Sequence, residues 1–291
     1  MTTKILITGA NGQLGNELNK LAAQYPNLEM LYTDIGNLDL TNRQACMDYI
    51  NIHQPKYIIN CAAYTAVDKA EDDADNAWKV NVEAVRNLLE ACKLNNVIFI
   101  QISTDYVFNG TNYRPYLETD KVLPESVYGR TKQQAEKEVL EYHKSLIIRT
   151  SWLYSSFGNN FVKTMLRLGN ERSEVSVIFD QIGTPTHAED LANTMLQIIN
   201  GIIIGEKNFV AGIYHYSNEG ACSWYDFARS IMKIAKLDCE VIPIETKDYP
   251  TPAKRPFYSV LNKSKIKTIF DIKIPHWENS LQSCIKNLTN V

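Results

Sequence analysis

A tyrosine and a lysine stand four positions apart in the stretch SVYGRTKQQAE, as Tyr128 and Lys132. Residues i and i+4 share one face of a helix, and the run after Ser126, the predicted N-cap, is rich in good helix formers. An ammonium beside a phenol favours the phenolate and lowers its pKa from about 10. We therefore interpret the pair as a candidate proton donor, although the same spacing also occurs on solvated helix faces that do no chemistry.

A glycine-rich turn lies near the start of the chain, where Gly9, Gly12 and Gly15 follow an apolar run in ILITGANGQLGNEL. Glycines let backbone N–H groups approach a pyrophosphate, and the N-terminus of the following helix favours an anion. Asp34, at the end of the next predicted strand, is placed to accept a hydrogen bond from an adenosine ribose. The pattern predicts a bound NAD or NADP, and the Asp34 carboxylate favours NAD because it repels a 2′-phosphate.

The elements that must position these residues alternate between strand and helix, because short apolar runs alternate with segments of helical spacing. We expect strands at 4–9, 29–34, 56–63, 97–103 and 145–152, and helices at 13–25, 41–53, 73–95 and 130–144, with Thr41 as the N-cap of the second helix. This alternation predicts an α/β fold with a Rossmann-like doubly wound parallel sheet.

The alternation loosens after about residue 150. Helices are expected at 159–170, 188–201 and 223–237, and a strand at 212–218. We predict an NAD(P)-binding Rossmann domain over 1–150 and, over 151–291, mainly a smaller C-terminal substrate-binding lobe with some elements returning to the first sheet.

Composition narrows the function classes. A net charge of −3 over 291 residues gives no sign of nucleic acid or an anionic membrane as partner, and no apolar run approaches the ~18 residues of a membrane span. The six cysteines form no C-x-x-C and no zinc spacing. The first residues lead directly into a strand without a signal-peptide pattern, so we expect a cytoplasmic location.

The motifs TGANGQLG, NCAAYTAVDKAE, STDYVFNG and YGRTK together resemble the extended branch of the short-chain dehydrogenase/reductase superfamily, which acts on sugar nucleotides. With RTSWLYSSFGNNFVKTML, DQIGTPT and RPFYSVLNKSK, essentially the whole chain is similar to the dTDP-4-dehydrorhamnose reductase family. The resemblance implies reduction of dTDP-4-dehydro-L-rhamnose by NADPH or NADH to dTDP-L-rhamnose, the last step of dTDP-rhamnose biosynthesis for cell-surface polysaccharide. It also allows a homodimer and Mg²⁺ at a subunit contact, but the sequence shows no metal-ligand cluster.

The resemblance further implies roles for individual residues. Thr104 would polarise the substrate carbonyl, Tyr128 would donate the proton, and Lys132 would bind the nicotinamide ribose. The implied cofactor-binding residues are Gly9, Gly12, Gln13, Leu14, Gly15, Asp34, Asp39, Leu40, Ala62, Ala63, Tyr64, Ser103, Tyr128 and Lys132. The implied substrate-binding residues are Thr65, Thr104, Asp105 and Trp152.

For several of these residues a purely structural role is the alternative interpretation. Asp39 and Leu40 either flank an adenine or form only a turn, and Trp152 either covers the sugar or belongs to the core. Arg255 in AKRPF either binds a diphosphate or forms a surface ion pair. His187, after GTPT, favours a structural role.

Two classes of alternative function remain. The first is another sugar-nucleotide enzyme of the same superfamily. A 4,6-dehydratase would resemble T-D-E after the fourth strand, whereas this chain has Tyr106 at the third position. A 4-epimerase is not excluded, although STDYVF is unlike epimerase segments. The second is a non-catalytic dinucleotide-binding subunit, similar to the regulatory subunit of methionine adenosyltransferase, which would not need an intact set of catalytic residues.

Overall fold

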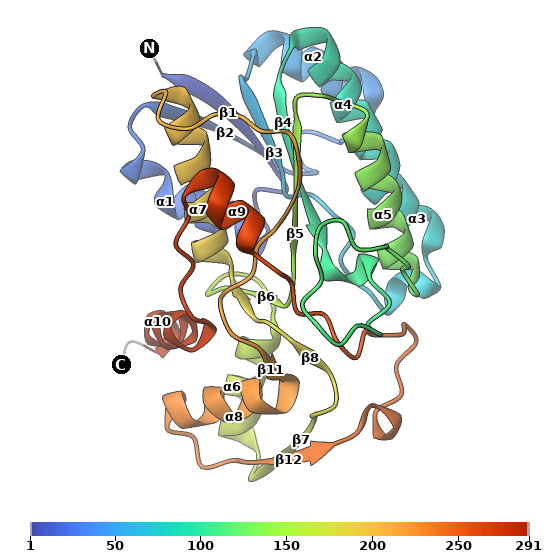
Figure 1. The fold of residues 1–291 in the computed structure, drawn as a ribbon, viewed down its shortest axis with the longest axis vertical. Coiled ribbons are helices and arrows are strands. Elements are labelled where there is room, and N and C mark those ends of the chain that lie inside the picture. Colours follow the sequence, from blue (N-terminus) through green and yellow to red (C-terminus); the bar gives the residue numbers. More distant parts are fainter. Residues whose placement is uncertain (1, 290–291) are drawn as a thin grey trace.

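A central sheet of six parallel strands organises the larger part of the molecule, and a smaller lobe lies at the carboxyl ends of these strands (Figure 1). The computed structural model describes residues 2–289. The strand order is β10-β5-β4-β3-β1-β2. Their bounds are β1 Thr3–Thr8, β2 Leu28–Thr33, β3 Tyr57–Asn60, β4 Ile98–Thr104, β5 Ser145–Thr150 and β10 Gly212–His215. The predicted fold class, α/β with a doubly wound parallel sheet, is confirmed.

Helices cover both faces of this sheet, as the apolar strands predict. One face carries α1, α7 and α9, and the other carries α2, α4 and α5 (Figure 1). Alternate strand residues divide between the two cores: Ile5 and Ile7 of β1 pack toward α1 and α7, and Leu6 packs toward α2 and α4. The bounds are α1 Gln13–Leu21, α2 Arg43–His53, α3 Ala74–Trp78, α4 Ala84–Asn95, α5 Val127–Leu140, α7 Ala188–Ile203 and α9 Ser264–Phe270.

One local prediction was wrong, and one helix contains an unpredicted feature. Thr41 is not the N-cap of α2, because its hydroxyl donates to Asp39; Asn42 caps the helix instead, accepting from the Ala45 N–H at 3.1 Å. The helix expected over 73–95 runs through 74–95 as predicted, but Lys79–Glu83 between α3 and α4 form a π-helical segment within it. Such π segments occur frequently at functional sites.

The smaller lobe packs around its own apolar cluster, which includes Val162, Phe227 and Leu281. Its elements are β6 Leu153–Tyr154, α6 Phe161–Glu171, β7 Glu174–Ile178, β8 Ile182–Gly183, β9 Thr186–His187, β11 Cys222–Ser223, α8 Trp224–Ala235, β12 Glu240–Ile244 and α10 Trp277–Thr289. Residues 188–215 return to the larger part of the molecule, where β10 pairs with β5 at the edge of the sheet and α7 packs beside α1 on one face. The chain therefore crosses between the larger part and the smaller lobe more than once.

None of the helices within residues 2–289 combines the length and the apolar character that a membrane span requires. All six cysteines are free thiols.

The core packing can be tested with two isoleucines of one helix. Ile50 of α2 is 0% exposed and Ile52 is 75% exposed. Ile50→Ala should lower the free energy of unfolding by about 2–5 kcal/mol, because it removes buried methyl groups and leaves a cavity. The matched control Ile52→Ala should change it by less than about 0.5 kcal/mol. Urea denaturation measures both, and equal losses would contradict the packing described.

Candidate active site

The glycine turn follows β1 at the point where the sheet changes winding direction, with β2 on one side of β1 and β3 on the other. Gly9 has a φ of +63°, and a Cβ there would lie 2.7 Å from the Ala62 backbone. Gly12 is the N-cap of α1 and has no side-chain cap, so N–H groups of the first turn remain available. Ligands of open α/β sheets bind at this crevice, and the turn fits a pyrophosphate.

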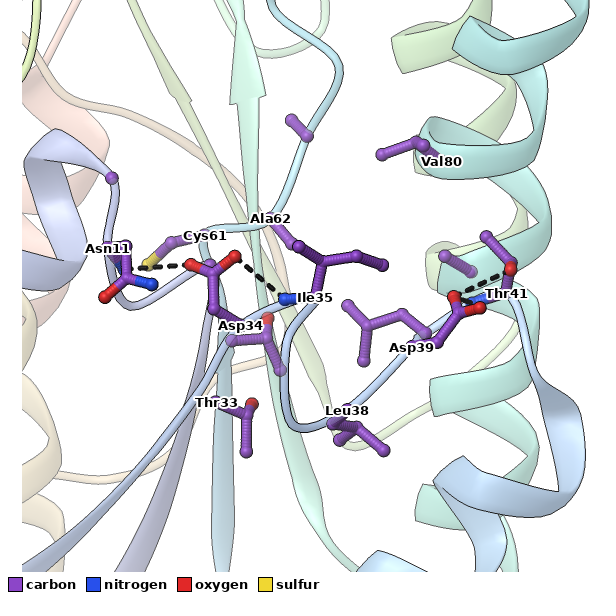
Figure 2. A pocket seen from close by; sticks show the side chains of 16 residues that line it. Asn11, Thr33, Asp34, Ile35, Leu38, Asp39, Thr41, Cys61, Ala62 and Val80 are labelled. Atoms are coloured by element: carbon purple, nitrogen blue, oxygen red, sulfur yellow. Dashed lines mark hydrogen bonds between the residues drawn. The ribbon is translucent and has the colours of Figure 1, made fainter.

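A cavity of ≈ 430 Å³ opens on one side of the turn (Figure 2). It brings together seven predicted cofactor-binding residues: Gly9, Gly12, Asp34, Asp39, Leu40, Ala62 and Ala63. The Asp34 carboxylate accepts from the Asn11 N–H at 2.9 Å and from the Ile35 N–H at 2.8 Å, so it also fastens two loops together. Asp39 accepts from the Thr41 hydroxyl at 2.7 Å and from the Thr41 N–H at 2.9 Å, so the two residues lie together on one side of the cavity (Figure 2).

A second cavity of ≈ 430 Å³ continues from the turn over the ends of β4 and β5. Its predicted lining residues are Gly9, Gly12, Gln13, Leu14, Ala63, Thr65, Ser103, Thr104, Asp105, Tyr128, Lys132 and Trp152. The two cavities share Gly9, Gly12, Cys61 and Ala63, so they meet at the phosphate turn. The fold thus brings the three predicted catalytic residues, Thr104, Tyr128 and Lys132, to one chamber.

Helix α5 presents Tyr128 to this chamber. As predicted, Ser126 caps the helix, accepting from the Gly129 N–H at 3.1 Å. Burial raises the pKa of Tyr128 to about 12, and its hydrogen bond with Thr104 opposes that rise. This direction is opposite to the depression expected from the sequence, because burial outweighs the groups that favour the phenolate. Tyr128 is therefore protonated at neutral pH.

Lys132 is 3% exposed, and its Nζ donates to the Ile102 carbonyl at 2.7 Å. Burial lowers the pKa of Lys132 to about 8, and the nearby Glu136 carboxylate opposes that fall. The ammonium is thus held at the end of β4, next to the tyrosine-bearing turn of α5.

Asp105 and Ser103 flank Thr104 and differ in their partners. Burial raises the pKa of Asp105 to about 6, against hydrogen bonds from Ser259 and Thr104, and Asp105 Oδ2 has no hydrogen-bond partner within residues 2–289. The Ser103 hydroxyl donates to Glu136 at 2.6 Å. Ser103 therefore lines the chamber with its hydroxyl already engaged.

Trp152 closes the chamber on the side of the smaller lobe. Its φ is +48°, a left-handed conformation that costs a non-glycine residue about 1–2 kcal/mol. Its ring stacks on Trp224 with centroids 3.6 Å apart, and a Cβ at Gly183 would lie 2.5 Å from the Trp152 ring. Trp152 therefore both lines the chamber and packs against the core of the smaller lobe.

Two predicted cofactor residues lie outside both cavities. Gly15 packs α1 against the turn, where a Cβ would lie 2.5 Å from Ala10. The Tyr64 hydroxyl donates to Asp73 at 2.9 Å.

Two of the residues with open interpretations, His187 and Arg255, take structural positions. His187 is the N-cap residue of α7 and is buried. Arg255 forms a bidentate ion pair with Asp68, at 2.6 and 3.0 Å, so it links the smaller lobe to the loop after β3.

Sequence reasoning missed several lining residues, including Asn11, Ile35, Cys61 and Thr150. All four follow or end a parallel strand, and that position was the available signal. It also missed Asn81 of the π-helical segment. The Asn81 side chain accepts from the Tyr64 N–H at 2.8 Å and donates to Thr131 at 2.9 Å. Asn81 therefore links the loop after β3 to α5.

One group of potential metal ligands, Glu17, His187 and Glu189, forms between α1 and α7. The sequence could not show it, because its members are far apart in the chain. Lys20 lies 2.8 Å from Glu189 and 3.8 Å from Glu17, so an ammonium already lies beside both carboxylates. We assign no step of a reaction to this group.

The whole length of the chain matches known proteins. The family model described as RmlD substrate binding domain matches residues 3–290. The chain belongs to this family. A relative described as dTDP-4-dehydrorhamnose reductase, from Aggregatibacter actinomycetemcomitans, is 44% identical over 287 residues, which cover 96% of this chain and 97% of that one.

Two solved structures of family members have the same fold. A dTDP-4-dehydrorhamnose reductase from Clostridium acetobutylicum has a TM-score of 0.92 at 43% identity, covering 98% of this chain and 99% of that one. One from Bacillus anthracis, in complex with NADP, has a TM-score of 0.92 at 39% identity, covering 99% of this chain and 100% of that one. The family resemblance expected from the sequence motifs is confirmed.

The turn geometry predicts how two glycines respond to substitution. Gly9→Ala should weaken NADPH and NADH binding about tenfold or more, because a left-handed alanine costs about 1–2 kcal/mol and its Cβ collides with Ala62. The control Gly36→Ala, with nothing within 4 Å of its Cβ, should leave both affinities unchanged. Nucleotide fluorescence titration measures these affinities, and unchanged binding in Gly9→Ala would remove the turn from the cofactor site.

Proposed function

We propose that this chain reduces the 4-keto group of dTDP-4-dehydro-L-rhamnose to dTDP-L-rhamnose, with NADPH or NADH as the reductant. The observation that carries the proposal is the convergence of Thr104, Tyr128 and Lys132 in one chamber next to a dinucleotide turn. The match to dTDP-4-dehydrorhamnose reductases along the whole chain supports this substrate. The reaction would complete dTDP-rhamnose synthesis for cell-surface polysaccharide.

The residues present fit a nicotinamide dinucleotide, because Gly9 and Gly15 let the turn pack closely against Ala62 and Ala10, and the uncapped first turn of α1 leaves N–H groups available for a pyrophosphate. Gly12, Gln13 and Leu14 would contact its phosphates, and Asp34, Asp39 and Leu40 its adenosine. Ala62 and Ala63 would contact its middle, while Ser103, Tyr128 and Lys132 would surround the nicotinamide ribose. When bound, the reduced nicotinamide supplies the hydride.

The chain's own residues supply the proton and the polarisation. Thr104 hydrogen-bonds the carbonyl oxygen, and Tyr128 gives its phenolic proton to that oxygen as negative charge develops. A pKa of about 12 keeps Tyr128 protonated at neutral pH, as a donor requires. The Lys132 ammonium holds the ribose hydroxyls and stabilises the phenolate that the transfer leaves.

The sugar would lie against Thr65, Asp105 and Trp152. The unpartnered Asp105 Oδ2 can accept from a sugar hydroxyl, and the Trp152 ring can cover an apolar face of the sugar. A third cavity of ≈ 400 Å³, lined by Trp224, Tyr249, Arg172 and Arg255, lies in the smaller lobe behind the Trp152–Trp224 stack. The Arg172 guanidinium and the aromatic rings suit a nucleoside diphosphate, the other half of the substrate, whereas the Arg255 guanidinium is paired with Asp68.

The alternatives gain no support from a specific observation. Tyr106 stands where a dehydratase would need a carboxylate, and its ring packs edge-on against Tyr128, 5.6 Å between centroids. A non-catalytic subunit would not require Thr104, Tyr128 and Lys132 to meet.

We place the reaction in the cytoplasm, since the six free thiols suit a reducing compartment. A homodimer stays a prediction, which sedimentation would test.

The proton donor is tested by Tyr128→Phe, which removes only the phenolic hydroxyl group. We expect kcat for dTDP-4-dehydrorhamnose reduction to fall by about 10²–10⁴-fold, with NADPH affinity close to that of the unmodified protein. The control Tyr113→Phe, at a side chain that is 91% exposed, should keep full activity. A Tyr128→Phe rate within about threefold of the unmodified rate would remove Tyr128 from the mechanism.

Cofactor preference is tested at Asp34. Asp34→Ala should weaken NADH more than NADPH, because it removes both a partner of the ribose 2′-OH and a charge that repels a 2′-phosphate. The control Asp48→Ala, on the exposed side of α2, should change neither affinity. Equal weakening of both nucleotides would mean that Asp34 serves only to fasten the loops at Asn11 and Ile35.

A further inference from the structure

A buried ion pair lies beneath the chamber, one helical turn beyond Lys132. Glu136 of α5 is 3% exposed and Arg149 of β5 is 2% exposed. The Arg149 guanidinium forks onto the carboxylate, with Nε 2.8 Å from Oε1 and Nη2 2.7 Å from Oε2. The Ser103 hydroxyl also donates to Oε1 at 2.6 Å. Both carboxylate oxygens are therefore engaged in short hydrogen bonds.

The sheet register explains why these groups meet. Ser103 of β4 and Arg149 of β5 are direct neighbours across the strand pair. They follow Phe99 and Ile147 at even spacing, so they project to the same face, toward α5. With the Lys132 contact to the Ile102 carbonyl, the end of β4 and the adjacent β5 hold α5 at two successive turns.

We propose that Glu136 is a positioning residue, fixed by Arg149 and Ser103, that keeps Lys132 charged and sets α5 at the height that brings Tyr128 over Thr104. The inference rests on the proposed function for its kinetic consequence, but the state of Lys132 can be measured without turnover.

Stability alone does not account for the pair. Taking two charges out of water costs nearly what their attraction returns, so a buried ion pair often stabilises a protein no better than apolar residues of the same volume. The position of the pair next to Lys132 suggests a second reason for its presence. Burial lowers the pKa of Lys132 to about 8, and the Glu136 carboxylate is the main group that opposes this. Without that charge, the buried amine would lose its proton at lower pH.

Four other ionisable groups of this region have pKa values far from 8. The groups that face Lys132 and Glu136 are Tyr128, Cys61, Asp105, Glu118, Arg149 and His215. The pKa of Tyr128 and of Cys61 is raised to about 12, and that of Asp105 to about 6, in each case mainly by burial. Burial and Arg149 lower the pKa of His215 to about 3. A titration near pH 8 in this chamber is therefore assigned to Lys132.

The kinetic test is Glu136→Gln, with kcat/KM for keto-sugar reduction measured from about pH 6 to about pH 10. Lys132 must be protonated to act, so activity falls as pH rises through its pKa. Removing the carboxylate lowers that pKa, and the falling limb should move by about one unit to lower pH, a roughly tenfold loss of rate on that limb. If Glu136 had only a structural role, Glu136→Gln would lower kcat/KM at every pH and leave the falling limb at the same pH.

A second measurement is independent of turnover. In protein labelled with ¹³C at the lysine ε-carbon, Lys132→Arg identifies the Lys132 signal by its disappearance, and the midpoint of that signal is followed against pH. We expect a lower midpoint in Glu136→Gln than in the unmodified protein. If the unmodified protein fails to reduce the keto sugar, the proposed function fails, and this midpoint still decides the role of Glu136.

Glu136→Gln leaves Arg149 buried without its partner and is at risk of unfolding, so the double variant Glu136→Gln/Arg149→Met removes both charges at similar volume. We expect it to fold and still to show the lower midpoint and the shifted limb. The matched control is Glu138→Gln, a half-buried glutamate of α5 paired with Arg86, which should change neither. An unmoved Lys132 midpoint in the folded double variant would overturn the proposal.

Discussion

Six parallel strands end at one edge, and the chemistry of the molecule depends on holding helix α5 at a fixed height over that edge. Tyr128 and Lys132 belong to the helix, whereas Thr104 belongs to the end of β4, so a small displacement of α5 would separate them. The polar contacts of Glu136 with Ser103 and Arg149 provide the fastening. Apolar packing of Ala135 and Val139 lower on the helix holds α5 against the sheet but is less directional.

Much of this arrangement could be predicted from the sequence, because it depends on local patterns. Alternating strands and helices fixed the parallel sheet, Ser126 marked the start of α5, and the glycine spacing located the phosphate turn at the winding change. Most of the predicted site residues line the two joined cavities for one reason: they follow strand ends, and parallel strands end together.

The features that the sequence did not predict depend on contacts between residues that only the fold brings together. The position of Tyr64 after β3 predicts a cofactor contact, which stays a prediction, but it gives no sign of the hydrogen bond that the Tyr64 hydroxyl donates to Asp73. The Tyr128 pKa rises because neighbouring elements bury the phenol, and the spacing to Lys132 contains no information about that burial. Arg149 looks like any strand residue until its register with Ser103 places it under α5. The π-helical segment at 79–83 likewise leaves no spacing signal, since its residues suit an ordinary helix.

The tryptophan stack between the two parts of the molecule also has an optical consequence. Trp152 and Trp224 lie nearly parallel, 9° between ring planes, and form the boundary between the chamber and the third cavity. The electronic transitions of two indoles at such a separation couple, which gives an exciton signal in circular dichroism. That signal depends on the angle and distance between the rings, so ligand entry on either side of the stack becomes visible spectroscopically, without any label and before hydride transfer.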